Sequence, residues 1–264
     1  MADPMYRRIA EDLRREIETG DLAPGEQLPT ELELRERFDA SRNTIRDAVK
    51  SLITLGLVQV RPGQGTFVTR PVDPFVATLS ADPRTGMGGG EGAAYLSEVS
   101  EAHRKPVISE PRVEIQAASG EVGTRLRVAD GTQLISRHER RFIDDQPWSL
   151  QTSFYPMDFV LKGATRLLEA TDIKEGTVHY LQEKLDLRQV GYRDWITMRA
   201  PDQNEVTFFR LPADGRVAVF EIFRTAFDQS GRAMRVTVTV FPGDRNQFIV
   251  NVGDIPAPQL GPEP

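Results

Sequence analysis

Apolar residues near the N-terminus recur at the three- and four-residue intervals of a helix with one buried face. They are Tyr6, Ile9, Ala10, Leu13 and Ile17. Asp3-Pro4 precedes them as a helix cap followed by proline, and Gly20 follows as a residue that commonly ends a helix. The pattern predicts a first amphipathic helix between these two signals.

Two further helices are predicted after this one. Thr30 and Glu33 have the spacing of a capping box, in which each side chain accepts a hydrogen bond from the backbone N–H of the other residue. They predict a short helix that ends near Phe38. Ser41 predicts the cap of a third helix that runs to about Leu55, so only a sharp turn separates the two.

The third helix has two different faces. Its apolar stripe consists of Ile45, Ala48, Val49 and Leu52. The opposite face carries Asn43, Arg46, Asp47 and Lys50. The stripe is core, whereas the polar face fits either ordinary solvated surface or a surface that reads a DNA groove.

A small hairpin follows the third helix. Residues 57–60 and 66–69 have the composition of short strands, and Gly63 and Gly65 lie in the turn that joins them. Three helices followed by a hairpin, with a sharp turn between the second and third helices, predict a winged helix-turn-helix.

The remainder of the chain is rich in predicted strands. Alternating patterns predict strands at 112–115, 134–142, 148–155, 217–223 and 235–241, and helices are expected at 163–170 and 176–185. Short turns join several of these strands, which predicts an α+β domain with a mainly antiparallel sheet.

Proline and glycine mark the boundary between the two parts. Residues 71–92 contain Pro71, Pro74 and Pro83 followed by five glycines, which is typical of a linker. We therefore expect a DNA-binding domain at 1–70, the linker at 71–92, an effector and dimerisation domain at 93–252 and a disordered tail at 253–264.

Composition excludes several classes of protein. The 264 residues are 39% hydrophobic and 27% charged, with no cysteine and no apolar run long enough for a transmembrane helix. Disulfides and cysteine-ligated zinc are therefore excluded, and with no signal peptide pattern we expect a cytoplasmic protein. His103, His138 and His179 are far apart in sequence, so neither a metal nor a cofactor is expected.

The charge is unevenly distributed. The formal net charge is −6, yet residues 41–70 contain five basic side chains and one acidic one. A basic segment on an acidic protein suits a face that attracts phosphates. Charge alone leaves an ordinary solvated face equally open.

The first seventy residues resemble the GntR family. The resemblance rests on Tyr6…Ile9…Leu13…Ile17…Gly20, on Pro24-Gly25…Leu28-Pro29-Thr30-Glu31, on Ser41 to Arg46, and on Gly63-Gln64-Gly65-Thr66-Phe67-Val68. The C-terminal part resembles the UTRA effector domain of the HutC subfamily, which has a chorismate-lyase-like fold. That resemblance rests on Arg141…Asp144…Pro147, Ser153…Pro156, Tyr180-Leu181…Leu185 and Asp228…Gly231…Asp244-Arg245.

The GntR resemblance implies that Arg42, Thr44 and Arg46 contact DNA, and Asn43 and Lys50 are placed to reach it as well. We also expect contacts from the hairpin residues Arg61, Gln64, Gly65 and Thr66, although glycines are needed in any tight turn. Leu32 stands where the family usually has a DNA-contacting arginine, and Arg35, one turn later, is its expected replacement.

The expected effector site lies on two strands. Its candidates are Arg137, Glu139, Arg141, Gln151 and Ser153. By the resemblance Arg141 matches one phosphate-binding arginine, but Glu139 occupies the place of the other. Because a carboxylate repels phosphate, we expect a ligand other than a simple sugar phosphate. A salt-bridge ladder across the strands explains the three charged residues equally well.

These observations predict a ligand-responsive repressor that binds a double-stranded DNA operator as a homodimer and has no membrane association. Dimerisation is implied by the resemblance alone. One alternative is a DNA-binding regulator without an effector, in which the C-terminal domain only dimerises. A lyase-like enzyme is another, because fold does not fix function.

Overall fold

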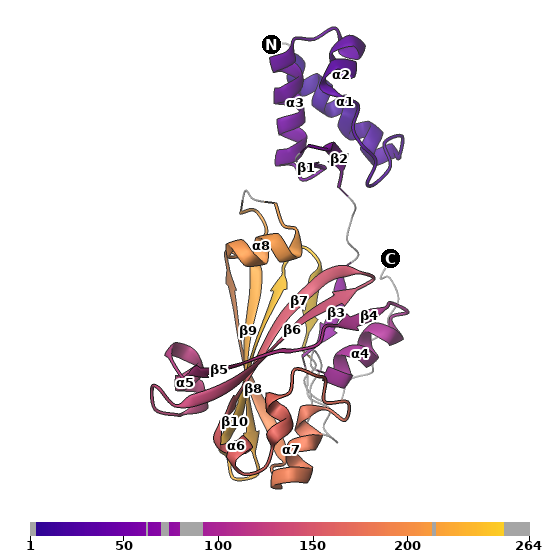
Figure 1. Cartoon of the computed structure of the whole chain (residues 1–264). Coiled ribbons are helices and arrows are strands. Elements are labelled where there is room, and N and C mark those ends of the chain that lie inside the picture. The colour runs from indigo at the N-terminus through magenta and orange to yellow at the C-terminus, as the bar shows by residue number, and fades with distance from the viewer. Residues whose placement is uncertain (1–3, 62, 70–73, 80–91, 213–214, 251–264) are drawn as a thin grey trace. The chain divides into compact units, whose positions relative to one another are not determined.

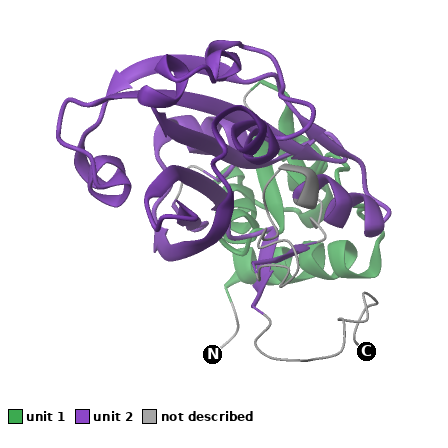
Figure 2. Ribbon diagram, turned by 90° about the horizontal axis from the view of Figure 1, so that it is seen from below, with its two compact units in different colours: residues 1–73 green, residues 74–264 purple. Residues whose placement is uncertain are grey.

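The computed structural model describes residues 4–61, 63–69, 74–79, 92–212 and 215–250 (Figure 1). The chain divides into two compact units, residues 1–73 and 74–264, which Figure 2 shows in different colours. The predicted tail at 253–264 lies outside the described residues.

The first unit is the winged helix-turn-helix that the sequence predicts. Its elements are α1 (Met5–Thr19), α2 (Glu31–Phe38), α3 (Arg42–Thr54), β1 (Val58–Arg61) and β2 (Gly65–Val68). Leu13, Leu34, Ile45 and Leu52 are fully buried between the three helices. This core holds α3 by its apolar stripe and leaves its polar face outside.

The predicted caps form. The Thr30 hydroxyl accepts a hydrogen bond from the Glu33 backbone N–H at 3.3 Å, and the Glu33 carboxylate accepts one from the Thr30 backbone at 2.7 Å. The Thr30 hydroxyl also donates to this carboxylate at 2.8 Å. The hydrogen bonds that the Glu33 carboxylate accepts, first from the Thr30 backbone N–H and then from the Thr30 hydroxyl, lower the pKa of Glu33. The Ser41 hydroxyl accepts from the Thr44 N–H at 3.2 Å and begins α3. Gly20 ends α1 in the left-handed conformation.

The hairpin has a neighbour that the sequence does not reveal. β1 and β2 pair antiparallel, with Val58 opposite Val68. The Leu28 N–H also donates to the Thr66 carbonyl at 2.8 Å, and the Val68 N–H donates to the Glu26 carbonyl at 2.8 Å. The segment before α2 therefore lies along β2 and ties the hairpin to the helices.

The second unit is built on an antiparallel sheet with the strand order β4-β6-β7-β10-β9-β8, and β5 also pairs with β6 (Figure 1). The strands are β4 (Pro106–Ile108), β5 (Arg112–Ala117), β6 (Gln133–Ile143), β7 (Gln146–Pro156), β8 (Gln189–Arg199), β9 (Val219–Asp228) and β10 (Ala233–Pro242). The mainly antiparallel α+β architecture is as predicted.

Helices cover both faces of this sheet. They are α4 (Gly92–Glu101), α5 (Gly120–Leu126), α6 (Asp158–Leu161), the 3-10 helix η1 (Thr165–Leu168), α7 (Thr177–Leu185) and α8 (Gln203–Phe209). Helices α6, η1 and α7 pack on the face that contains Ile135 and Tyr155. α5 packs on the opposite face, against Leu134 and Val236, and α8 packs near Val240.

Several predicted elements differ in extent. The helix expected at 163–170 is only the four-residue η1, and the strand expected at 217–223 runs from Val219 to Asp228. β8 was not predicted. It lies at the end of the sheet and exposes both polar and apolar side chains, so it lacks a clear alternation.

The predicted linker contains a strand. β3 (Phe75–Thr78) pairs in parallel with β11 (Asn246–Ile249), so residues 75–78 belong to the second unit rather than to a linker at 71–92. The nearby prolines gave this segment the composition of a linker, but Phe75 and Ala77 are buried. The remainder of the predicted linker, 71–73 and 80–91, lies outside the described residues.

Candidate nucleic-acid interface and effector site

The first turns of α3 present basic side chains to solvent. Arg42 and Arg46 are 62% and 59% exposed, whereas Ile45 between them is completely buried. Asn43 and Lys50 are exposed as well. One face of α3 is therefore anchored in the core while the other is free to enter a DNA major groove, which a helix fits.

Glu31, at the start of α2, holds the two arginines together. Its carboxylate lies 2.6 Å from Arg46 Nε and 3.3 Å from Arg42 Nε. Burial opposes the charge on Glu31, but the hydrogen bonds and charges of the two arginines outweigh it and lower its pKa. The guanidinium groups are thus orientated side by side. Glu31 belongs to the family motif noted above, but its contacts with the two arginines could not be predicted from the sequence, because these partners lie eleven and fifteen residues away.

Thr44 belongs to the N-terminal cap of α3. Its hydroxyl lies 2.8 Å from that of Ser41, and it is only half-buried. The N-terminal end of a helix carries unpaired N–H groups and a partial positive charge, both of which favour a phosphate. Thr44 is therefore close to a natural anion-binding position.

The hairpin turn is held by Gln27. The Gln27 side chain donates a hydrogen bond to the Gln64 carbonyl at 3.1 Å. A Cβ at Gly65 would lie 2.5 Å from Gln27 Nε2, and Gly65 has a φ of +125°. The positive φ thus favours glycine at position 65, and a larger residue would also have to displace the Gln27 side chain, whatever Gly65 does on DNA. Gln64 is exposed and Thr66 half-buried, and the Arg61 guanidinium lies 4.2 Å from the centre of the Phe67 ring.

Leu32 and Arg35 are both exposed on α2, and Leu32 is 60% exposed. Leucine has no hydrogen-bond donor, so this position cannot hold a phosphate as arginine does. Arg35 lies one turn later, in the last turn of the same helix.

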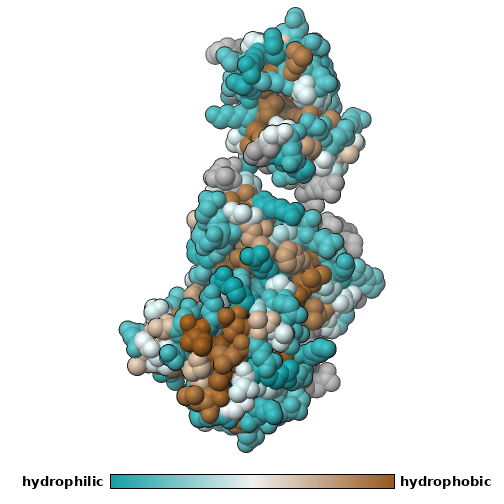
Figure 3. Space-filling view, viewed as in Figure 1, coloured by the Kyte–Doolittle hydropathy of each residue, from teal (hydrophilic) through white to brown (hydrophobic). Residues whose placement is uncertain are grey.

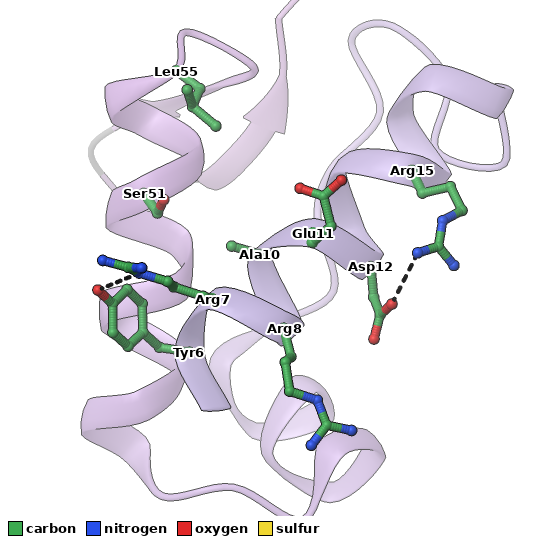
Figure 4. A pocket seen from close by; sticks show the side chains of 9 residues that line it. All are labelled: Tyr6, Arg7, Arg8, Ala10, Glu11, Asp12, Arg15, Ser51 and Leu55. Carbon is green, nitrogen blue, oxygen red and sulfur yellow. Dashed lines mark hydrogen bonds and ion pairs between the residues drawn. The ribbon is translucent and has the colours of Figure 1, made fainter. Parts of the chain in front are cut away.

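A groove between α1 and the C-terminal half of α3 lies away from Arg42 and Arg46, which are at the N-terminal end of α3 (Figure 4). α1 contributes Tyr6, Arg7, Arg8, Ala10, Glu11, Asp12 and Arg15. Ser51 comes from the C-terminal half of α3, and Leu55 is the residue that caps the end of this helix. Two cations of the groove have partners: Arg15 lies 3.6 Å from Asp12, and Arg7 donates to the Tyr6 hydroxyl. The groove has mixed charge and contains no residue of the candidate DNA surface.

In the second unit, β6 and β7 bring the predicted effector residues together. Arg137 pairs with Ser153, and Glu139 pairs with Gln151. Arg141 pairs with Ser149, which is fully buried and was not predicted. All six lie on one face of the sheet, because side chains alternate along a strand.

Arg137 has a structural role. Its guanidinium donates to four backbone carbonyls at the end of η1 and in the following segment, those of residues 166, 167, 169 and 171, at 2.7 to 3.3 Å. These bonds employ Nη1 and Nη2, and Arg137 is buried. The side chain fastens a loop to the sheet, which does not fit the predicted role in effector binding.

Arg141 and Glu139 form a different arrangement. Arg141 is 1% exposed, and its Nη2 lies 3.7 Å from the Glu139 carboxylate. Its guanidinium also lies 4.8 Å from the centre of the Tyr95 ring on α4. Burial raises the pKa of Tyr95 to about 12, so this phenol is neutral. This contact joins two residues of the same strand, whereas the alternative left open by the sequence was a salt-bridge ladder across strands.

Hydroxyl and amide groups continue this polar face on β10. The Ser153 and Thr237 hydroxyls lie 3.2 Å apart, and the Thr239 hydroxyl lies 3.4 Å from Gln151 Oε1. All four residues are buried. The face is therefore a polar layer within the unit.

The described part of the chain contains no group of three or more residues suited to hold a metal ion. Within the same residues, no helix has the length and apolar character needed to cross a bilayer.

Comparison with known families assigns both units. The model of the GntR family of bacterial regulatory proteins matches residues 5–68, and that of the UTRA domain matches residues 102–247. The chain belongs to the GntR family and carries a UTRA domain. It is a DNA-binding transcriptional regulator, not an enzyme, as the sequence analysis predicted.

Individual relatives are similar to this chain along most of its length. The HTH-type transcriptional repressor NagR of Bacillus subtilis is 43% identical, over 93% of each chain. An uncharacterized HTH-type transcriptional regulator of Streptomyces coelicolor is 27% identical, over 92% of this chain and 90% of its own. The crystal structure of PhnF from Mycobacterium smegmatis matches with a TM-score of 0.54 at 21% identity, over 93% of this chain and 99% of PhnF, and supports the fold.

Proposed function

We propose that this chain is a cytoplasmic repressor of the HutC subfamily, which binds an operator as a homodimer and responds to a small molecule. The observation that carries the proposal is the pair Arg42 and Arg46, held by Glu31 on the exposed face of α3. The description of the 43% identical relative as a repressor supports the direction of regulation.

The proposed DNA contacts divide between two grooves. Arg42, Asn43, Thr44, Arg46 and Lys50 reach the major groove from α3. Gln64, Gly65 and Thr66 approach the adjacent minor groove with Arg61, and Arg35 contacts the backbone. A bidentate arginine–guanine pair supplies about 1–3 kcal/mol of discrimination, whereas phosphate contacts supply position and salt dependence.

Genomic mapping of binding sites tests this proposal most directly, because the neighbouring genes also indicate the metabolite that is sensed. The strongest mapped site is then titrated with purified protein at several salt concentrations. We expect tight binding that weakens steeply as salt rises, since phosphate contacts release counterions. A purified chain that ignores double-stranded DNA at low salt contradicts the proposal.

The edge of the large sheet is the proposed dimer surface. β8 ends the strand order and so offers backbone N–H and C=O groups to a further strand. Its exposed apolar residues are Val190, Trp195, Ile196 and Met198. Figure 3 shows apolar patches on the surface of this unit. Antiparallel pairing of β8 with its copy satisfies twofold symmetry, which supports a second chain as the occupant.

Replacing Trp195 by aspartate will shift the protein from dimer to monomer, because it places a charge at the proposed contact. Sedimentation velocity measures the change. Leu161→Asp is the matched control, since Leu161 is 81% exposed on α6 and lies off β8, while Trp195 is 53% exposed. A Trp195→Asp protein that stays as dimeric as the control rejects this surface.

The polar face of β6, β7 and β10 is the proposed effector site, with Glu139, Arg141, Gln151 and Ser153 as its contacts. Arg137 leaves the set because backbone carbonyls occupy its guanidinium. With Glu139 beside Arg141, the carboxylate offsets the charge of the arginine, and the site binds a doubly charged phosphate poorly. Glucosamine 6-phosphate at micromolar concentration will therefore leave operator binding unchanged in a gel-shift titration, and release of DNA contradicts this expectation.

One observation favours a regulator without an effector. The hydroxyls of Ser153 and Thr237 bond each other, as do Thr239 and Gln151, so part of the polar face is already satisfied within the protein. Unexplained density on this face in a crystal structure of protein purified from its native host supports the effector. A face filled by these side chains alone supports the alternative.

A further inference from the structure

β3 is firmly attached to the second unit. Besides its pairing with β11, the Phe75 N–H donates to the Arg245 carbonyl at 3.0 Å and the Leu79 N–H donates to the Ile249 carbonyl at 2.9 Å. Phe75 and Leu79 are buried, and Leu79 packs in a cluster with Ile222 and Phe241. The strand is thus part of the folded unit although it lies next to the DNA-binding unit in sequence.

Three side chains of the large sheet hold the end of β3. The Tyr192 hydroxyl donates to the Leu79 carbonyl at 2.5 Å. The Arg224 guanidinium lies 3.8 Å from the centre of the Tyr192 ring and forms two hydrogen bonds to Asp194, at 2.8 and 2.7 Å. We call Leu79, Tyr192, Asp194 and Arg224 the clasp. Because Arg224 is buried and fixed by Asp194, the ring beneath it has little freedom.

The clasp determines the length of chain that joins the two units. With β3 in place, the connection from β2 to β3 is residues 69–74, six in number. Without β3 it extends to the start of α4 and comprises residues 69–91, twenty-three in number. Fully extended, these lengths reach about 20 Å and about 75 Å, respectively.

We propose that the clasp sets the spacing between operator half-sites that the dimer accepts. This inference rests on the proposed homodimer. Two DNA-binding units that share one dimeric body reach only those half-sites that their connections can span together. A short connection imposes a narrow range of spacings, and a long one relaxes it while lowering the effective concentration of the second unit.

The size of the effect follows from the connection length. Effective concentration falls roughly as the −3/2 power of length, so lengthening from six to twenty-three residues lowers affinity at the preferred spacing about sevenfold. At spacings that the short connection cannot span, the same change raises affinity. The change in affinity thus has opposite signs at the two kinds of spacing. A general loss of folding or of DNA binding lowers the affinity and does not raise it at any spacing.

The release variant combines Tyr192→Phe, which removes the hydroxyl donor, with Leu79→Ala, which removes the apolar anchor. A half-site is first selected from random DNA with the full-length protein. Inverted repeats of it with spacers of graded length are then titrated. Tyr180→Phe is the matched control, because it also removes a tyrosine hydroxyl that bonds to the backbone, here by accepting from the Arg166 N–H. Hydrogen exchange of residues 74–79 measures the release of β3 directly.

A reversible disulfide between β3 and β11 tests whether holding β3 in place restores the spacing preference. The chain has no cysteine, so Val76→Cys with Gln247→Cys introduces a single thiol pair at positions that are register partners in β3 and β11. Neighbouring strands lie about 4.8 Å apart, within the range that a disulfide bridges. Added to the release variant, the oxidised pair is expected to restore the narrow spacing, and reduction is expected to remove it.

The outcomes separate this inference from the proposed function. A wild-type protein with a narrow spacing preference, broadened in the release variant and restored by the oxidised thiol pair, supports the clasp. The same narrow preference in wild type and release variant, with faster exchange of residues 74–79, overturns the clasp proposal and leaves the homodimer intact. A wild-type protein that is indifferent to spacing also overturns the clasp proposal, and one that binds a single half-site as tightly as the inverted repeats overturns the homodimer as well.

Discussion

Replacing Arg46 by alanine will weaken binding to the selected operator about tenfold or more, since one base-reading arginine contributes about 1–3 kcal/mol. Arg46 is exposed on α3, and the Glu31 carboxylate fixes its Nε. The side chain is therefore orientated before DNA arrives, and its loss removes both a contact and a part of that order. Gel-shift titration against the operator and against unrelated DNA measures the change in affinity and in specificity.

Arg37→Ala is the matched control for this experiment. It removes the same charge from the same unit, but Arg37 lies on α2 and pairs with Glu16 of α1. We expect it to reduce affinity far less and to leave specificity intact. If Arg46→Ala and Arg37→Ala bind the operator with equal affinity, the assignment of α3 as the base-reading helix is wrong.

Replacing Arg137 by methionine will lower the free energy of unfolding of the second unit by about 3 kcal/mol, since it leaves several buried carbonyls without their donor. Methionine preserves much of the volume, so the loss reports the hydrogen bonds. Urea unfolding followed by tryptophan fluorescence measures it, because both tryptophans, Trp148 and Trp195, belong to this unit.

Arg166→Met is the companion variant. Arg166 is about one-third exposed and pairs with Glu175, and we expect its loss to change the free energy of unfolding far less, because solvent screens such a pair. If Arg137→Met unfolds at the urea concentration of the wild type and instead abolishes a response to ligand, Arg137 returns to the effector site.

Local signals in the sequence were sufficient to predict the helices of the first unit. Thr30 and Ser41 cap their helices because the bonds involved span three residues, and such spacing is visible in the chain itself. The buried stripe of α3 was visible for the same reason. The segment at residues 26–28, however, joins the hairpin through backbone groups, and these carry no signature of residue type.

Long-range contacts account for most of what was missed at the candidate sites. The role of Glu31 in holding the two arginines was not predicted, because only the folded turn between α2 and α3 brings it to Arg42 and Arg46. Arg137 was assigned to the effector because its partners are carbonyls about thirty residues away. A charged residue on a predicted strand has the same appearance whether it binds a ligand or a loop.

The strand β3 shows a similar limit. Its apolar residues are few and lie among prolines, and its partner β11 is at the other end of the domain. Composition therefore indicated a linker, whereas pairing with a strand some 170 residues later makes the segment part of the sheet unit.

The separation of β3 and β11 along the chain also determines the order in which the parts of the protein can fold during synthesis. During synthesis the helix-turn-helix emerges first and needs no later residue to complete its core. β3 follows soon afterwards but has no partner until residues 246–249 leave the ribosome. A nascent chain consequently acquires its DNA-reading surface well before β3 pairs with β11. A chain whose synthesis stops before β11 has the DNA-reading surface but lacks this strand pairing.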